Sequence, residues 1–298
     1  MPADSNTSTA RTPRAYHSAS LLIRGRELHW GSRSFLMGIV NLAPDSFSGD
    51  GLDHDPEAAA RLACRFEAEG ANLIDIGAES SRPGAAELAP DVELDRLLAS
   101  VRAIRAATGL PLFVDTYHAA VAEAALEAGV DGVNDIHGLR RDPAMARVIA
   151  AAGCPIVAMH NQRGRKPGDV IADITSGFCE TIRIAEGAGI DPSRLILDPG
   201  FGFGWTPEQN LEMVRRLPEL ASFELPLLLG VSRKSTIGFV LDAPVDQRLE
   251  GTAALVSLGV AGGADVARVH DVAAMRRVIA VADATVRGTW RHESRSSG

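Results

Sequence analysis

Several features are scarce in this chain of 298 residues, and each scarcity excludes a class of protein. The three cysteines, at positions 64, 154 and 179, form no CxxC pair, so neither a disulfide framework nor a zinc ribbon is expected. No apolar run approaches the roughly 18 residues of a membrane helix, and the N-terminus lacks the apolar core of a secretory signal. The sequence therefore predicts a cytoplasmic protein with no membrane partner.

Basic residues are also in deficit. Lys and Arg number 30 against 38 Asp and Glu, which gives a formal net charge of -8. Proteins that bind nucleic acids over a broad surface are usually basic, so no nucleic-acid partner is expected.

Hydrophobic residues are plentiful, at 46% of the chain, and they recur in one pattern. A short run rich in Val, Ile and Leu is followed by a polar or glycine-containing segment and then by an amphipathic helix. The expected strands are 35–40, 72–77, 111–115, 131–135, 155–159, 194–198, 226–230 and 265–269. The expected helices are 56–70, 91–107, 118–128, 143–152, 175–188, 207–220, 246–262 and 271–287.

Eight such units predict a single α/β domain, a (β/α)₈ TIM barrel, over residues 21–287. Residues 1–20 and 288–298 are polar and are expected to be flexible tails. An open doubly wound sheet is the competing architecture, but it usually carries a GxGxxG turn after the first strand, and the turn here reads NLAPDSFSGDGLD.

The barrel fold predicts where the chemistry takes place, because such barrels place their active sites at the carboxyl ends of the strands. The last two strands are followed by a group of cations, Arg233, Lys234, Arg268 and His270. Barrels often bind phosphate at this position, although the same side chains could be ordinary surface charges or ion pairs.

The middle strands end in Asp115, Asn134 and Asp198. Carboxylates and an amide that converge on one pocket can recognise a flat heterocycle with N–H donors and ring-nitrogen acceptors. Alternatively, each of them could cap the helix that follows. A zinc site built from His118, His137 and His160 is a third hypothesis, but no HxH or HExxH spacing supports it.

Seven motifs together carry a family resemblance. They are MGIVNLAPDSFS, DIGAESSRPGA, VDTY, GVNDIHGL, LDPGFGFGWTPEQN, GVSRKSTIG and ARVHDV. In this order and spacing, over about residues 35–285, the chain resembles the dihydropteroate synthases, which are pterin-binding TIM barrels of folate biosynthesis.

The resemblance implies an enzyme that joins 6-hydroxymethyl-7,8-dihydropterin pyrophosphate to p-aminobenzoate. The products are 7,8-dihydropteroate and pyrophosphate, the mechanism is SN1-like and Mg²⁺ is the cofactor. The implied partners are therefore these small-molecule substrates and a second copy of the chain in a homodimer.

The same resemblance assigns roles to individual positions. The implied catalytic residues are Asp45, Asp115, Lys234 and Arg268. The implied pterin-binding residues are Asp115, Asn134, Met159, Asp198 and Lys234. Pyrophosphate is assigned to Asn41, Ser81, Arg82, Arg268 and His270, with Asn41 also on the metal. The p-aminobenzoate pocket is assigned to Ser46, Phe47, Ser81, Arg82, Pro83, Phe203, Lys234 and Ser235.

The chain departs from the usual family pattern beside that last pocket. The departures are Ala43, the pair Gly49-Asp50, Ser81, the run 161–163 (Asn-Gln-Arg) and Thr236. They put the affinity for the aryl amine and the response to sulfonamides in question, and they suggest the hypothesis of a sulfonamide-insensitive variant.

Two other functions remain open at this point. A barrel that transfers a methyl group between methyltetrahydrofolate and a corrinoid protein would share the pterin-reading residues but would have little use for the SRKS string. A pterin-binding protein without catalytic activity is the non-enzyme alternative. For the homodimer, the small residues Ala253, Ala254, Gly259 and Gly262 suit either a subunit interface or packing against the barrel.

Overall fold

A computed structural model of the chain describes residues 16, 18–43, 51–77, 89–166 and 168–288. The strands are β1 (Ser20–Ile23), β2 (Arg26–His29), β3 (Phe35–Asn41), β4 (Leu73–Gly77), β5 (Leu112–Asp115), β6 (Gly132–Asp135), β7 (Ile156–Met159), β8 (Leu195–Asp198), β9 (Leu228–Leu229) and β10 (Val266–Val269). The α-helices are α1 (Pro56–Glu69), α2 (Pro90–Ala107), α3 (Ala119–Glu127), α4 (Met145–Ala152), α5 (Val170–Ala188), α6 (Pro207–Arg216), α7 (Ser235–Leu241), α8 (Leu249–Gly262) and α9 (Val272–Arg287). Short 3₁₀ helices are η1 (Pro192–Arg194), η2 (Leu217–Phe223) and η3 (Val245–Gln247).

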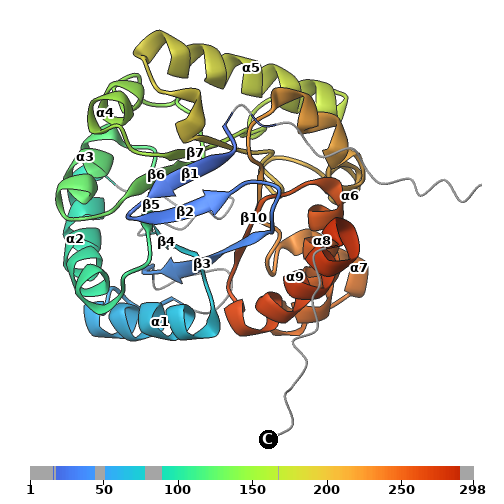
Figure 1. The fold of residues 1–298 in the computed structure, drawn as a ribbon, viewed down its shortest axis with the longest axis horizontal. Helices are drawn as coiled ribbons and strands as arrows, with labels where there is room; N and C mark the ends of the chain where they lie inside the picture. The colour runs from blue at the N-terminus through green and yellow to red at the C-terminus, as the bar shows by residue number, and fades with distance from the viewer. Residues whose placement is uncertain (1–15, 17, 44–50, 78–88, 167, 289–298) are drawn as a thin grey trace, which may run out of the picture.

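Strands β3 to β10 form one parallel sheet in the order β8-β7-β6-β5-β4-β3-β10-β9. The sheet closes because Leu197 N donates to Pro226 O at 2.9 Å and Leu197 bridges Leu227, which joins β8 to the segment that leads into β9. The helices surround the strands as an outer ring (Figure 1). The predicted (β/α)₈ barrel is therefore confirmed, with all eight expected strands in place.

Local sequence signals define the helix ends. Asp55 accepts hydrogen bonds from the backbone N–H groups of Glu57 and Ala58 at the start of α1, and Gly70 ends that helix in the left-handed conformation. Thr206 and Gln209 form a capping box at the start of α6. Because α1 follows β3 and α6 follows β8 along the chain, these capped helix starts lie at the carboxyl ends of the strands.

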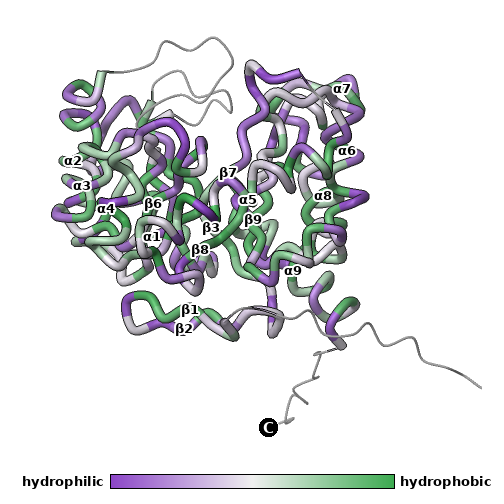
Figure 2. Tube along the Cα trace, turned by 90° about the horizontal axis from the view of Figure 1, so that it is seen from above, coloured by the Kyte–Doolittle hydropathy of each residue, from purple (hydrophilic) through white to green (hydrophobic). Residues whose placement is uncertain are grey.

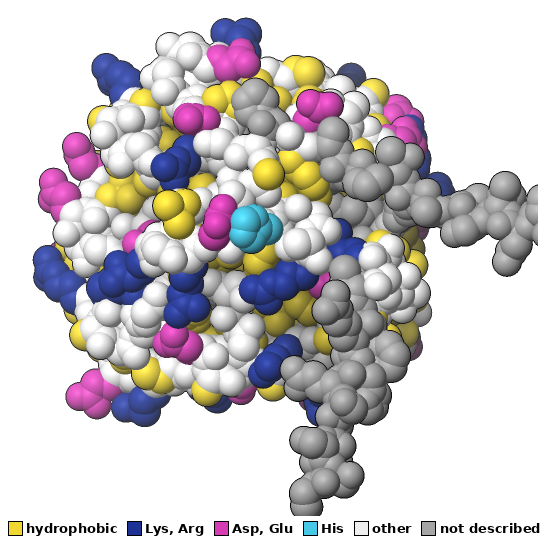
Figure 3. Space-filling model, in the orientation of Figure 1, with side chains coloured by type: hydrophobic (Ala, Val, Ile, Leu, Met, Phe, Trp, Pro, Cys, Tyr) yellow, Lys and Arg dark blue, Asp and Glu magenta, His cyan; other side chains and the backbone are white. Residues whose placement is uncertain are grey.

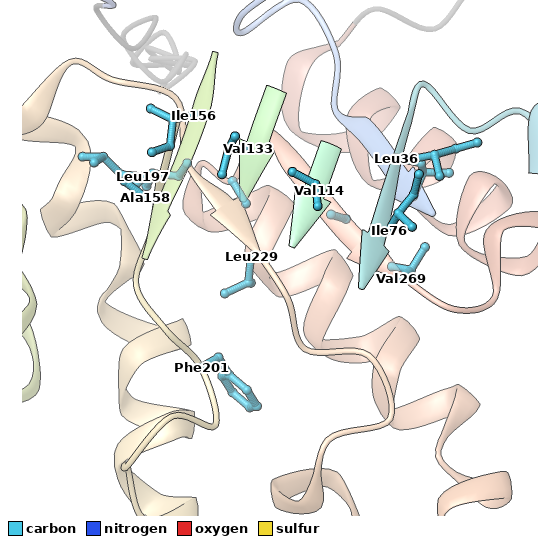
Figure 4. Packing of buried hydrophobic residues seen from close by; sticks show 14 of the residues in the cluster. Leu36, Ile76, Val114, Val133, Ile156, Ala158, Leu197, Phe201, Leu229 and Val269 are labelled. Atoms are coloured by element: carbon cyan, nitrogen blue, oxygen red, sulfur yellow. The ribbon is translucent and has the colours of Figure 1, made fainter. Parts of the chain in front are cut away.

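The outer hydrophobic layer lies between the strands and the helices. Leu36, Ile76, Val114, Val133 and Leu197 are fully buried in it (Figure 4). Because side chains alternate along a strand, the neighbours of these residues point into the barrel instead. This alternation determines which residues can face a ligand.

Sequence reasoning missed the antiparallel hairpin of β1 and β2 that precedes the barrel. Leu21, Ile23, Leu28 and Trp30 of the hairpin region pack with interior residues such as Phe113. Figure 2 shows the hairpin across the end of the barrel opposite α7, where it closes the amino-terminal end.

The tail predictions lie mostly on residues 1–15, 17 and 289–298, which are outside the described residues. Within the range 1–20, Tyr16 Oη donates to Asp265 Oδ1 at 2.6 Å and Ser20 begins β1. No helix in the described part of the chain is both long and apolar enough to cross a membrane. On the hairpin face, several basic side chains lie in a row across the middle, with acidic side chains on both sides of it (Figure 3).

Candidate functional site

A pocket opens at the carboxyl ends of the strands, the end at which α/β barrels carry their active sites. Eight of the residues predicted from the sequence line it: Asp115, Asn134, Met159, Asp198, Phe203, Lys234, Arg268 and His270. They come from five different strands and the loops that follow β8, β9 and β10. The structure thus brings into one pocket the side chains that the sequence suggested as two separate groups, with one exception. Arg233 lies outside the pocket lining and pairs with Asp271, with its Nη2 2.6 Å from Oδ1.

Strand register explains why these side chains meet. Asp115 pairs with Asn134 across β5 and β6, and Met159 pairs with Asp198 across β7 and β8. Asp115, Met159 and Asp198 each lie two residues beyond an interior apolar residue of the same strand, so the period-2 alternation keeps these side chains inside the barrel. Asn134 lies opposite Asp115 on the neighbouring strand and lines the same pocket.

Arg268 occupies the centre of the charge network. Its Nε contacts Asp75 Oδ2 at 2.5 Å, and its Nη2 contacts Asp115 Oδ2 at 3.0 Å. Although burial opposes it, the negative charges of Asp75 and Asp115 raise the pKa of Arg268. A guanidinium held on two carboxylates has a fixed orientation, which suits it to receive an anionic group of a ligand.

Asp75 is a site residue that sequence reasoning missed. Its side chain is 0% exposed, and Oδ2 also accepts a hydrogen bond from Asn134 Nδ2 at 3.0 Å. One carboxylate therefore orients both the cation and the amide of the pocket. The signal was available in the string LIDIG, where a charged residue interrupts a buried apolar strand and must have a partner.

Asp198 and Lys234 form the second charged pair of the pocket. Burial raises the pKa of Asp198, and the positive charge of Lys234 opposes that rise. Burial lowers the pKa of Lys234 to about 7. The negative charge of Asp198 opposes this decrease, and the positive charge of Arg268 adds to it. Lys234 is thus a cation that can lose its charge near neutral pH.

The Lys234 side chain is also tied to the loop after β8. Its Nζ donates to the carbonyl oxygen of Phe201, and it lies 4.5 Å from the centroid of the Phe203 ring. Lys234 immediately precedes α7, a helix that sequence reasoning missed because its seven residues follow directly on a charged loop. Ser235 is the first residue of α7 and is exposed.

Two further predicted residues lie at the ends of β3 and β10. His270 Nδ1 is 2.8 Å from Ser232 Oγ, which orients the imidazole at the pocket. Asn41 ends β3 and is half-buried, and its Oδ1 accepts from Ala43 N at 3.2 Å. An amide oxygen at this position is a suitable ligand for a hard divalent cation.

Six predicted site residues lie outside the described residues. They are Asp45, Ser46, Phe47, Ser81, Arg82 and Pro83.

The histidines of the zinc hypothesis have other surroundings. His118 Nδ1 is 2.8 Å from Glu93 Oε2, while His160 is buried with its Nε2 2.9 Å from Gln162 Oε1. Burial lowers the pKa of His160 to about 4, so that ring is neutral at physiological pH. Over the described ranges, no group of three or more His, Cys, Asp or Glu side chains is arranged to hold a metal ion.

Comparison with known proteins identifies relatives of the whole barrel. Residues 37–270 match the family described as "Pterin binding enzyme". The dihydropteroate synthase of Bacillus subtilis is 42% identical over 257 residues, which cover 86% of this chain and 90% of that protein.

Solved structures agree. A dihydropteroate synthase of Xanthomonas albilineans, determined with 4-aminobenzoic acid, has a TM-score of 0.84 and 40% identity, and covers 90% of this chain and 98% of its own. A dihydropteroate synthase of Yersinia pestis in a sulfonamide drug complex has a TM-score of 0.85 and 38% identity, and covers 91% of this chain and 100% of its own. Fold and sequence thus point to the same relatives over nearly the full barrel.

Proposed function

The chain belongs to the dihydropteroate synthases of the pterin-binding enzyme family, and from that premise we propose how its own residues carry out the reaction. The reaction joins 6-hydroxymethyl-7,8-dihydropterin pyrophosphate to p-aminobenzoate and releases pyrophosphate. The single observation that carries the proposal is the pocket in which Asp115, Asn134, Asp198, Lys234 and Arg268 converge from separate strands and loops.

The pterin ring is bound by the polar side chains deep in this pocket. Carboxylates at Asp115 and Asp198 can accept hydrogen bonds from the ring N–H and amino groups, while Asn134 offers an amide. Met159 is only 2% exposed and lines the same pocket, so it supplies an apolar surface for a flat ring. This pattern of acceptors around one apolar surface selects a heterocycle rich in N–H donors.

The pyrophosphate group lies against Arg268 and His270, with Lys234 close by. These donors stabilise the negative charge that develops on the leaving group as its C–O bond breaks. The leaving group takes the electron pair of that bond, and positive charge remains on the exocyclic carbon of the dihydropterin. Asp115 stabilises that positive charge until the amine of p-aminobenzoate attacks and loses a proton.

Mg²⁺ is part of the proposal as the partner of the pyrophosphate oxygens. A Mg²⁺ ion in such sites is often held by one or two protein oxygens plus substrate phosphates. Asn41 at the end of β3 offers one amide oxygen, which fits an ion held mainly by the substrate. When bound, the ion neutralises charge on the leaving group.

The p-aminobenzoate pocket is proposed around Phe203, Lys234 and Ser235. Phe203 is 8% exposed and lines the pocket, and the positive charge of Lys234 suits the carboxylate of this substrate. The remaining predicted residues of this pocket, Ser46, Phe47 and the run 81–83, are proposed to complete it.

Whether sulfonamides compete here is tested by comparing the inhibition constant of sulfamethoxazole with the KM of p-aminobenzoate. Similar values would contradict an insensitive variant.

A homodimer is proposed through the outer face of α8 and α9. Ala253 and Ala254 line an apolar groove between these helices, together with Val281, which is 68% exposed. A second copy would cover this surface. Gly259 and Gly262 instead pack inside the molecule, because an added Cβ atom would meet Leu229 of β9 at Gly259 and Leu217 of η2 at Gly262.

A cytoplasmic location completes the proposal. All three cysteines are free thiols, as expected in a reducing compartment.

The activity is tested by following pyrophosphate release with both substrates and Mg²⁺. We expect one 7,8-dihydropteroate for each pyrophosphate released. Lys234→Ala and Arg268→Ala are expected to lower kcat/KM by about 100-fold, which corresponds to a loss of roughly 2.7 kcal/mol of transition-state stabilisation. Unchanged kcat/KM in both variants would refute the site.

Methyl transfer to a corrinoid in place of condensation would identify the methyltransferase alternative, and pterin binding without turnover would identify the non-enzyme alternative.

A further inference from the structure

The segment 160–163, which follows β7, is built directly against the loop that follows β8. His160 N donates to Asp198 O at 2.8 Å, and Gln162 N donates to Phe203 O at 3.0 Å. The approach is close enough that a Cβ atom at Gly204 would lie 2.5 Å from Arg163 N. The backbone of this segment is therefore held in a fixed relation to Asp198 and Phe203.

Arg163 extends from this segment to the aromatic ring of the pocket. Its guanidinium carbon lies 4.5 Å from the centroid of the Phe203 ring, the same distance as Lys234 Nζ. Two cations therefore contact one ring, and the ring faces of aromatic side chains attract cations. Arg163 is partly buried, and that burial lowers its pKa.

The same residue acts on the neighbouring cation. The positive charge of Arg163 is one of the contributions that lower the pKa of Lys234, after burial and the repulsion of Arg268. The guanidinium is thus close enough to the pocket for its field to act on groups inside it, and it remains protonated at any physiological pH.

We propose that Arg163 determines charge specificity in the aryl-amine subsite through its own positive potential beside Phe203. This inference rests on the proposed function. A carboxylate distinguishes p-aminobenzoate from neutral aryl amines, and a second fixed cation beside Phe203 favours the charged substrate.

The test compares Arg163→Gln with Arg163→Lys, and uses Arg165→Gln as the matched control. Arg165 lies two residues further along, is exposed and carries the same charge, so its replacement changes net charge equally. Each enzyme is measured for the KM of both substrates and for kcat. Its affinities for p-aminobenzoate and for the neutral p-aminobenzamide are measured by calorimetry. Thermal unfolding confirms that each variant is folded.

In Arg163→Gln we expect the KM and dissociation constant of p-aminobenzoate to rise about tenfold, with the values for p-aminobenzamide and the pterin pyrophosphate within about twofold of wild type. Arg163→Lys restores most of the affinity, because the charge remains. Arg165→Gln behaves as wild type.

An unchanged KM for p-aminobenzoate in Arg163→Gln, with normal wild-type turnover, overturns the inference and leaves the proposed function standing. Equal losses for the charged and the neutral aryl amine also overturn it, since they indicate a purely structural role. If wild type binds p-aminobenzoate but forms no dihydropteroate, the proposed function fails, and the calorimetric affinities still decide the role of Arg163.

Discussion

At the scale of single residues, Asp75 shows how a buried carboxylate can organise a binding site without facing solvent. Replacement of Asp75 by Asn keeps the shape of the side chain but removes its negative charge. That charge orients Arg268, and the same carboxylate accepts the hydrogen bond from Asn134 Nδ2. We expect Asp75→Asn to lower kcat/KM by about 100-fold, because loss of one partner leaves a partly buried charge poorly compensated. Steady-state kinetics measures the effect. The matched control is Asp95→Asn on the exposed side of α2, and a value for Asp75→Asn within threefold of wild type would contradict the role.

Lys234 gives a pH dependence with a definite sign. Its pKa of about 7 means that the free enzyme loses this positive charge as the pH rises through neutrality. The value of kcat/KM for the pterin pyrophosphate reports the free enzyme and is therefore expected to fall between about pH 6 and pH 8.

The control for this prediction is Lys234→Arg, in which the charge persists at all these pH values. The ratio of wild type to variant removes any titration of the substrate itself. A ratio that does not change with pH would show that the charge on Lys234 has no part in binding.

Also at this scale, the sequence predicted the inward-facing polar residues at strand ends but not the residue that connects them. Asp115 and Asp198 end their strands and Asn134 is the last residue but one of β6, and a polar side chain is conspicuous at these positions. Asp75 lies inside a strand, two residues before its end, and only the observed contacts with Arg268 and Asn134 show that it belongs to the pocket.

At the scale of elements, close backbone contact between two loops positions the pocket. Gly200 has φ +79°, and a Cβ atom there would lie 1.9 Å from the carbonyl oxygen of His160. Gly153 has φ +60° but has open space around it. Both glycines have positive φ, but only at Gly200 would an added Cβ atom also clash with a neighbouring atom. Comparing alanine variants at the two positions therefore distinguishes the cost of backbone strain from the cost of the clash.

We expect Gly200→Ala to lower the free energy of unfolding by about 3 kcal/mol or more, and Gly153→Ala by about 1 kcal/mol, since only the first adds a clash to the cost of positive φ. Urea denaturation measures both. Equal losses in the two variants would show that the loop after β8 can move away from β7 without penalty.

Element prediction succeeded where hydrophobic periodicity is strong and failed where elements are short. All eight barrel strands are apolar runs, and they lie where the sequence predicts them. Helix α7 has only seven residues, and β9 is reduced to Leu228–Leu229. Elements this short depend on tertiary contacts, such as the pairing of β9 with β10, that a local pattern does not contain.

At the scale of the whole molecule, the two ends of the barrel have different roles. The carboxyl ends of the strands carry the pocket, and the amino ends, covered by the hairpin, contribute to stability. Leu28 of the hairpin is 3% exposed against the barrel interior, whereas Leu22 of the same hairpin is 61% exposed. We expect Leu28→Ala to cost about 2–4 kcal/mol of unfolding free energy and Leu22→Ala less than about 0.5 kcal/mol.

Neither hairpin variant should change the KM of either substrate. The pocket is lined by residues at the carboxyl ends of the strands, whereas the hairpin crosses the other end of the barrel (Figure 2). Thermal unfolding checks the expected loss of stability, and steady-state kinetics on the same preparations checks that the KM values are unchanged. A raised KM in Leu28→Ala at a temperature where it is fully folded would show that the two ends are coupled.

The central claim is that one pocket of this barrel reads a pterin with Asn134 and Asp198 and holds its pyrophosphate with Arg268. A crystal structure of the protein with the dihydropterin pyrophosphate and Mg²⁺ tests it most directly. The account predicts ring N–H groups or amino groups within hydrogen-bond distance of the Asp198 carboxylate, and phosphate oxygens on the Arg268 guanidinium. A pterin bound elsewhere, or bound here with its pyrophosphate directed away from Arg268, would contradict it.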